Sequence, residues 1–200
     1  MSICLAISGV DWSLTKDIVS MIGTIGVLTI GVVGLSTWRK QLLGTSKYQV
    51  AKDILTATYR LQDAMQAVRS PMVYLKREEV EAGNQLKEEQ RVYSERLRYL
   101  DEQKSILRTL ALEARAIWGE QGEQCLEKLN ALVGTLHAEI WLHFWLKGAY
   151  AGSGATVDRN PKRVQANDDV VYWTSGDDNF SKQIASAVQD VEEMFQSKMR

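Results

Sequence analysis

Residues 18–38 read IVSMIGTIGVLTIGVVGLSTW, a run of 21 residues without a charged side chain. An α-helix rises 1.5 Å per residue, so this run forms a helix of about 31 Å, which matches the hydrocarbon core of a lipid bilayer. Asp17 precedes the run, and Arg39 and Lys40 follow it directly, so the uncharged segment has sharp ends. The sequence therefore predicts a transmembrane helix over residues 18–38.

Two other interpretations of this segment are open. A cleaved signal peptide needs a basic start, a shorter apolar stretch and a small-residue cleavage site, whereas Asp11 and Asp17 lie before this segment. A buried core helix is the second alternative, although apolar stretches of that kind are usually shorter. The span is preferred because both its length and its flanks agree with it.

The flanking charges predict the orientation of the span. Arg39, Lys40 and Lys47 follow it, whereas only Lys16 precedes it, beside two aspartates. Basic flanks stay in the cytoplasm, so residues 1–17 are expected to be a short extracytoplasmic N-terminus and the C-terminal body to be cytoplasmic. Tryptophan and basic residues favour the membrane interface, where we expect Trp12, Trp38, Arg39 and Lys40.

Small residues inside the span fall on one face of the helix. At 100° per residue, six of them lie within an arc of about 140°; they are Ser20, Gly23, Gly26, Gly31, Gly34 and Thr37. Small side chains let a second helix approach closely, which is how helices associate in lipid. Glycine is also common in membrane helices, and no strict G-x-x-x-G occurs. We expect the span to self-associate through this face, which makes the protein a homo-oligomer.

The composition excludes several classes of protein. The chain has 24 Lys and Arg against 25 Asp and Glu, and this balance argues against a basic nucleic-acid-binding protein. Only three charges precede residue 39, so a near-zero total hides an apolar end and a highly charged remainder. Cys4 and Cys125 lie on opposite sides of the predicted span and cannot pair within one chain. With His137 and His143 they do not supply a zinc site, so we predict no metal and no cofactor.

After the span, the apolar positions follow helical periods. A basic juxtamembrane linker over residues 39–45 leads to a break at Gly44–Ser46, and the helix that follows ends before Pro71. Its apolar positions repeat at spacings of three and four, as in a heptad seam; they are Ala51, Ile54, Thr58, Leu61, Met65 and Val68. Charged residues of this helix, Arg69 among them, are expected on its solvated side.

Three further long helices are expected, over residues 86–118, 123–150 and 179–200, the last with an Asp178–Asn179 cap. Residues 119–122 are expected to break the chain, and residues 151–178 to form a long loop with a short extended piece at 170–173.

The predicted fold is all-α. An N-terminal transmembrane helix is followed, in residues 46–200, by a cytoplasmic helical domain of about four helices. These helices form an antiparallel bundle or a long coiled-coil-like hairpin, because each of them must bury one apolar stripe.

Few residues suggest chemistry. Glu139 and His143 share a helix face and resemble half of a metal or acid–base site, but a buried histidine with one hydrogen-bond partner is favoured. The glycine-rich residues 152–156 lack the lysine of a phosphate-binding loop, so a flexible linker is favoured there.

Two sets of residues in the predicted loop are candidates for contacts. Tyr172 and Trp173 are the best candidates for a protein partner, because aromatic side chains are enriched at binding hot spots. Arg159, Lys162 and Arg163 are candidates for contact with an anion such as a lipid headgroup, although nearby aspartates dilute their charge. We predict no catalytic residue.

The stretches Trp38-Arg39-Lys40-Gln41-Leu42-Leu43-Gly44 and Val68-Arg69-Ser70-Pro71, together with the C-terminal amphipathic helix, give the chain a resemblance to small bacterial single-pass membrane proteins of uncharacterised activity. The resemblance implies a bacterial inner-membrane location. It implies no activity and no site residues.

Three functions are weighed. The leading expectation is a non-enzymatic, membrane-tethered helical interaction module that self-associates and presents its cytoplasmic bundle to an unknown protein partner. The alternative is a membrane-perturbing or channel-forming effector whose glycine-faced span oligomerises. The third is an enzyme with an unrecognised site, which is disfavoured because no acid–base or nucleophile set is recognisable.

Overall fold

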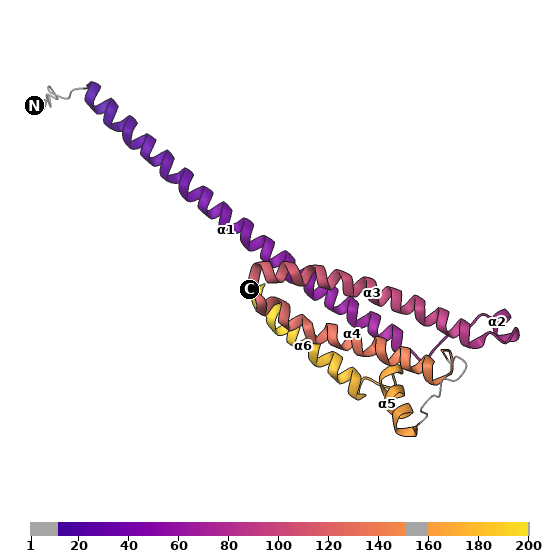
Figure 1. Cartoon of the computed structure of the whole chain (residues 1–200). Coiled ribbons are helices and arrows are strands. Elements are labelled where there is room, and N and C mark those ends of the chain that lie inside the picture. Colours follow the sequence, from indigo (N-terminus) through magenta and orange to yellow (C-terminus); the bar gives the residue numbers. More distant parts are fainter. Residues whose placement is uncertain (1–11, 151–159, 200) are drawn as a thin grey trace, which may run out of the picture. The chain divides into compact units, whose positions relative to one another are not determined.

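The computed structural model describes residues 12–150 and 160–199, with side chains from Lys16 onward, and this part of the chain contains helices and no β-strand (Figure 1). The predicted all-α class is confirmed. The described helices are α1 (Trp12–Arg69), α2 (Arg77–Glu81), α3 (Gln85–Trp118), α4 (Glu120–Leu146), α5 (Pro161–Val171) and α6 (Asn179–Lys198). By their contacts, residues 1–46 and residues 47–200 form two compact units.

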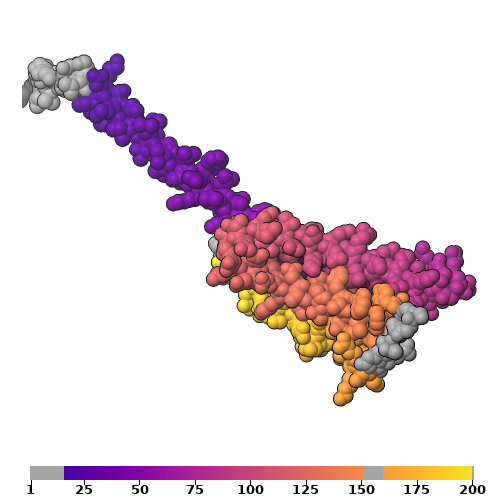
Figure 2. All heavy atoms as spheres, in the orientation of Figure 1, coloured from indigo at the N-terminus to yellow at the C-terminus, as the bar shows by residue number. Residues whose placement is uncertain are grey.

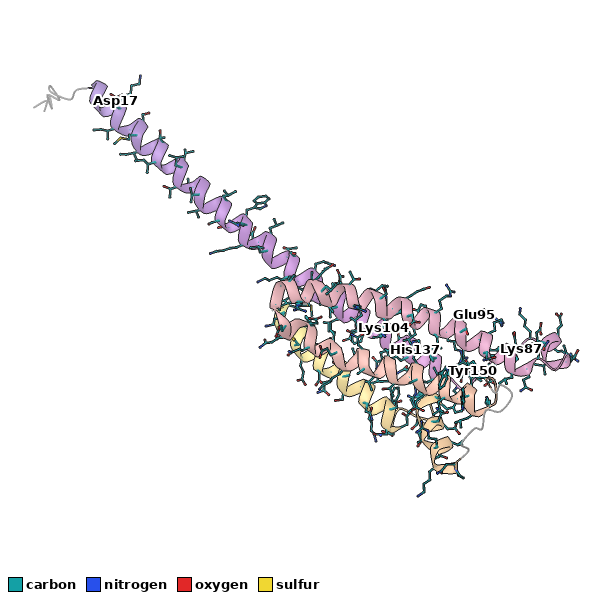
Figure 3. The ribbon with its side chains drawn as sticks, in the orientation of Figure 1. Asp17, Lys87, Glu95, Lys104, His137 and Tyr150 are labelled. Carbon is teal, nitrogen blue, oxygen red and sulfur yellow. The ribbon has the colours of Figure 1, made fainter. Side chains whose placement is uncertain are left out.

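The first unit contains the N-terminal part of α1, whose apolar side chains project on all sides of the helix (Figure 3). Three hydroxyls here donate to carbonyls of the same helix, Thr24 to Ser20 at 2.9 Å, Thr29 to Ile25 at 2.7 Å and Ser36 to Val33 at 2.8 Å. A hydroxyl that bonds to its own helix needs no water, so these residues are compatible with an apolar solvent.

The predicted helix break at Gly44–Ser46 is wrong, because α1 continues through residues 39–45 and beyond them to Arg69. A single glycine in a helix costs only about 1 kcal/mol relative to alanine. The neighbours Gln41, Leu42 and Leu43 are good helix formers, and no proline interrupts the stretch. Helix propagation therefore overrides the local break signal of Gly44–Ser46.

Within the second unit, α1 contributes the predicted heptad seam to one core. All six of its positions are buried: Ala51, Ile54, Thr58, Leu61, Met65 and Val68. The helix ends where predicted, since Pro71 cannot supply the amide hydrogen that a further turn requires. The seam packs with apolar residues of the later helices in one continuous cluster.

Helices α3 and α4 lie side by side in opposite directions (Figure 1), and Figure 2 shows their surfaces in contact along the hairpin. Polar pairs mark the register, Arg115 with Glu123, Asp101 with His137 and Glu89 with Lys147. Residue numbers on α4 rise as those on α3 fall, as an antiparallel pair requires.

The corner between α3 and α4 is tighter than predicted. Only Gly119, with a φ of 73°, separates the two helices, so the expected break is present but is confined to this residue and does not extend to 122. Gly122 lies inside α4 and is buried, and a Cβ added there would lie 2.8 Å from the carbonyl oxygen of Ala114. Glycine is needed at this point because the backbones of the two helices approach so closely.

Helix α4 ends at Leu146, four residues before the predicted end. The amide of Gly148 donates to the carbonyl of Trp145 and the amide of Ala149 to that of Phe144, and Gly148 has a φ of 83°. This hydrogen-bond pattern is a Schellman motif, which stops a helix at a residue with positive φ.

The predicted long loop over residues 151–178 is wrong in its second half, because residues 161–171 form α5. Pro161 occupies the first turn, where its missing amide hydrogen costs nothing, and the Asn160 side chain accepts from the amide of Lys162. Val170 and Val171 are therefore helical rather than extended, whereas Tyr172 has extended backbone angles. Residues 151–159 lie outside the described part of the chain.

Helix α6 begins as predicted, with the Asp178 carboxylate accepting from the amide of Ser181 at 2.7 Å. It packs along α4, and the apolar residues at its helical spacings of three and four are buried: Phe180, Ile184, Val188, Val191 and Phe195.

Arg69, expected on a solvated surface, is instead fully buried. Its guanidinium donates to the Asp178 carboxylate at 3.0 Å and to the Ser181 hydroxyl at 2.8 Å. It also donates to three carbonyls around the end of α5, those of Asp169, Val170 and Tyr172. Arg69 therefore ties the end of α1 to the end of α5 and the start of α6.

Candidate functional site

The apolar segment of α1 is long and apolar enough to cross a membrane. Its large apolar side chains are exposed, from 45% at Ile18 to 74% at Ile30. A Cβ added at Gly23, Gly26 or Gly34 would meet nothing within 4 Å, and the same holds for Gly31. The face that these glycines share with Ser20 is therefore open to another helix.

The predicted interface residues flank this segment. Trp38 is 61% exposed, and Arg39 and Lys40 are exposed in the turn that follows. The side chain of Trp12 lies outside the described residues, although its backbone begins α1. Their placement at a membrane surface stays a prediction.

The second unit brings polar residues from separate helices together around His143, a buried residue of α4. Its Nε2 lies 3.2 Å from the Tyr172 hydroxyl and 3.7 Å from Glu89 Oε1 of α3. Its Nδ1 lies 4.0 Å from the Asp168 carboxylate of α5. Lys147, the residue directly after the end of α4, donates to the same Glu89 carboxylate. The imidazole therefore lies between carboxylates of two other helices.

The surroundings of this cluster lower the pKa of Glu89 and raise the pKa of Tyr172. The neighbouring His143 imidazole, and then the hydrogen bond from Lys147, hold the pKa of Glu89 below its ordinary value against the effect of burial. Burial, and then the charges of Glu89 and Asp168, raise the pKa of Tyr172. Near neutral pH, Glu89 is therefore ionised and the Tyr172 phenol keeps its proton.

His143 is buried with a hydrogen-bond partner, as the favoured interpretation predicts, and the alternative pairing with Glu139 is not formed, because the Glu139 carboxylate accepts from the Asn167 amide at 2.7 Å. The same amide group donates to the Glu139 carbonyl. The buried Asn167 thus fastens α5 to α4. Its own Oδ1 has no hydrogen-bond partner in the described part of the chain.

An open pocket of about 480 Å³ lies between α4 and α5 beside this cluster. Its polar wall is made of His143, Lys147, Asn167, Asp168 and Tyr172. The two carboxylates nearest His143 face opposite ring nitrogens, so one metal ion cannot collect all three groups. Consistent with this, no metal-binding cluster of His, Cys, Asp and Glu is found among the described residues.

The predicted contact residues have different environments. Tyr172 is half-buried with its hydroxyl on His143, whereas Trp173 is 43% exposed. Lys162 and Arg163 are exposed in the first turn of α5, and Arg159 lies outside the described residues. A role in partner or anion binding stays a prediction for both sets.

Sequence reasoning missed Asn167 and Asp168, because residues 161–171 were assigned to a loop. A signal was present. Asn160–Pro161 is a helix start, and Val164, Asn167 and Val171 recur at spacings of three and four. A polar residue at the centre of such an apolar stripe marks a buried hydrogen bond.

The chain was compared with protein-family models, curated proteins and solved structures, and no match was found in any of the three.

Proposed function

We propose that this protein is a non-enzymatic, membrane-tethered helical interaction module. Residues 18–38 form its span, with the N-terminus outside and residues 46–200 in the cytoplasm. The span self-associates through its glycine face, and the cytoplasmic part is an antiparallel helical bundle that is presented to a protein partner.

One observation carries this proposal, namely the full exposure of the apolar segment within a helix. Large apolar patches are rare on soluble monomers, and here 21 successive residues carry no charge. The bonding of Thr24, Thr29 and Ser36 to their own helix supports lipid as the surrounding solvent, because no water is available there to bond a free hydroxyl.

Partner binding by the second unit is supported by exposed aromatic side chains. Trp141 is 54% exposed, stacks on Tyr150 with ring centroids 5.9 Å apart, and contacts Trp145. Tyr150 lies beyond the end of α4 (Figure 3). Aromatic groups that remain exposed are common anchors of protein interfaces, and Trp173 adds a second such group.

Self-association is tested with the full chain in phosphatidylcholine vesicles, labelled at the C-terminus with donor or acceptor dyes. The test variant carries Gly23→Leu, Gly26→Leu and Gly34→Leu. We expect it to need about tenfold more protein per lipid to reach the same energy transfer, which corresponds to about 1.4 kcal/mol of lost association.

A matched control carries three leucines on the opposite face: Met21→Leu, Ile25→Leu and Val32→Leu. These positions lie about 160–200° from Gly23, and the control should transfer energy as the unchanged chain does. Equal loss in both variants, or no energy transfer by the unchanged chain, contradicts self-association through the glycines.

Dye release from the same vesicles separates the module from the channel-forming alternative. The hydroxyls of Thr24, Thr29 and Ser36 are all bonded to their own backbone, and Thr24 lies about 120–140° around the helix from the other two, which disfavours a polar pore lining. We expect no release. Release that disappears with the glycine-to-leucine variant would favour the channel instead.

A further inference from the structure

The pocket between α4 and α5 has the size of a small-molecule site. Its volume of about 480 Å³ falls within the range of known ligand pockets. Leu146 and Val164 supply an apolar wall, and the charged groups Lys147 and Asp168 come from different helices. Such a combination of apolar surface with a few convergent polar groups is typical of a binding site.

The two charges remain separate across this pocket. No ion pair within 4.0 Å joins Lys147 to Asp168 among the described residues. Lys147 donates one hydrogen to Glu89 and has two more to offer, because an ammonium carries three. Within the described part of the chain, the ion-pair partner of Asp168 is His143 at 4.0 Å, and the Asp168 side chain is 39% exposed. The pocket thus presents a positively charged hydrogen-bond donor, Lys147, and a negatively charged hydrogen-bond acceptor, Asp168.

A third group adds an unmet requirement. Asn167 is 1% exposed and borders the pocket, and its Oδ1 has no partner within the described residues. A buried carbonyl-type oxygen without a donor costs about 1–3 kcal/mol. The Asn167 amide turns toward Glu139 on α4, and its oxygen is closed off from solvent, so the acceptor that a ligand in the open pocket can reach is the Asp168 carboxylate.

We propose that this pocket binds a small zwitterion of the α-amino acid type with an apolar side chain. The ligand ammonium is held by the Asp168 carboxylate. The ligand carboxylate accepts from Lys147, and its side chain lies against Leu146 and Val164. This site is independent of the membrane span and goes beyond the proposed interaction module.

The test is calorimetric titration of the full chain in detergent micelles with three compounds that share one branched apolar chain. L-leucine carries both charges, 4-methylpentanoate lacks the ammonium, and 3-methylbutylamine lacks the carboxylate. We expect L-leucine to bind in the micromolar to millimolar range, and each singly charged compound to bind at least tenfold more weakly, because each loses a charge-assisted hydrogen bond.

Matched variants place the ligand. Asp168→Asn should weaken L-leucine binding at least tenfold. Asp169→Asn should change it less than twofold, because Asp169 lies on the same helix but its carboxylate accepts from Gln165 at the surface. Thermal unfolding followed by circular dichroism shows that both variants are folded before titration.

Three results overturn the proposal. The first is no heat of binding for L-leucine at millimolar concentration and tenfold excess over the protein. The second is equal affinity for L-leucine and one singly charged compound. The third is an equal loss of L-leucine affinity in the two aspartate variants. Binding of phosphoethanolamine in preference to L-leucine overturns the amino acid assignment and identifies a lipid headgroup instead.

Discussion

Two stretches of the same helix, residues 18–38 and residues 51–68 of α1, differ in where their apolar side chains lie. In the first, apolar residues surround the helix and are all exposed. In the second, they recur at spacings of three and four and are buried in one cluster with apolar residues of the later helices. The comparison shows that periodicity distinguishes a segment suited to lipid from one suited to a protein core, although both are helical and apolar.

The largest expected effect concerns the end of the buried stretch. Arg69→Met should destabilise the second unit by about 3–5 kcal/mol, because it leaves the Asp178 carboxylate and three carbonyls without their buried partner. Urea unfolding of the full chain in micelles, followed by circular dichroism, measures this. Arg60→Met is the control, since Arg60 is exposed on the same helix; an equal loss in both variants would contradict the role of Arg69.

The next largest effect contrasts the proposed lipid environment of residues 18–38 with the water around the surface of the second unit. Leu28 and Leu112 are exposed to similar degrees, 63% and 57%. Leu28→Arg should cost about 3–4 kcal/mol of membrane insertion, because it places a charge at the centre of the span. Leu112→Arg should change insertion little. Alkaline extraction of membranes measures both, and an equal, small effect would show that residues 18–38 lie in water.

A smaller effect separates two glycines of α4. Gly122→Ala should destabilise the second unit by about 1–3 kcal/mol, because its methyl group would meet the backbone of Ala114. Gly134→Ala should stabilise it by about 0.5–1 kcal/mol, because the space there is open and alanine favours helix. Thermal unfolding distinguishes the signs, and two changes of the same sign would contradict the close approach at Gly122.

The smallest effect is the loss of stability in acid through the ion pair of Arg69 with Asp178. Burial raises the pKa of Asp178, but hydrogen bonds from Ser181 and Arg69 outweigh it and hold that pKa below its ordinary value. A lowered pKa gives stability above the unfolded value that is lost as pH falls through the folded value. Between pH 5 and pH 2.5 the melting temperature should therefore fall more steeply for the unchanged chain than for Asp178→Asn. Parallel curves would exclude this contribution.

Local sequence signals were sufficient to predict the features that depend on neighbours along the chain. Pro71 predicted the end of α1, and Asp178 predicted the cap of α6, because proline and capping side chains act within one turn. The heptad seam of residues 51–68 predicted burial correctly for the same reason.

Features that depend on tertiary contacts could not be predicted in this way. The charge of Arg69 suggested a surface position, and only its partners on α5 and α6 account for its burial. Gly44 suggested a break that the surrounding helix formers override. The pocket beside His143 is formed by α4 together with α5, so it cannot be predicted when residues 161–171 are expected to form a loop.

The hydrogen bonds of Arg69 also set an order of events during synthesis. Its partners lie 100 to 112 positions later in the chain, which corresponds to about 5–20 s of translation at 5–20 residues per second. Until α6 leaves the ribosome, the arginine has no buried partner and stays hydrated, so the end of α1 cannot reach its final packing. A nascent chain arrested near residue 150 is therefore expected to be far more sensitive to protease around Arg69 than the finished protein.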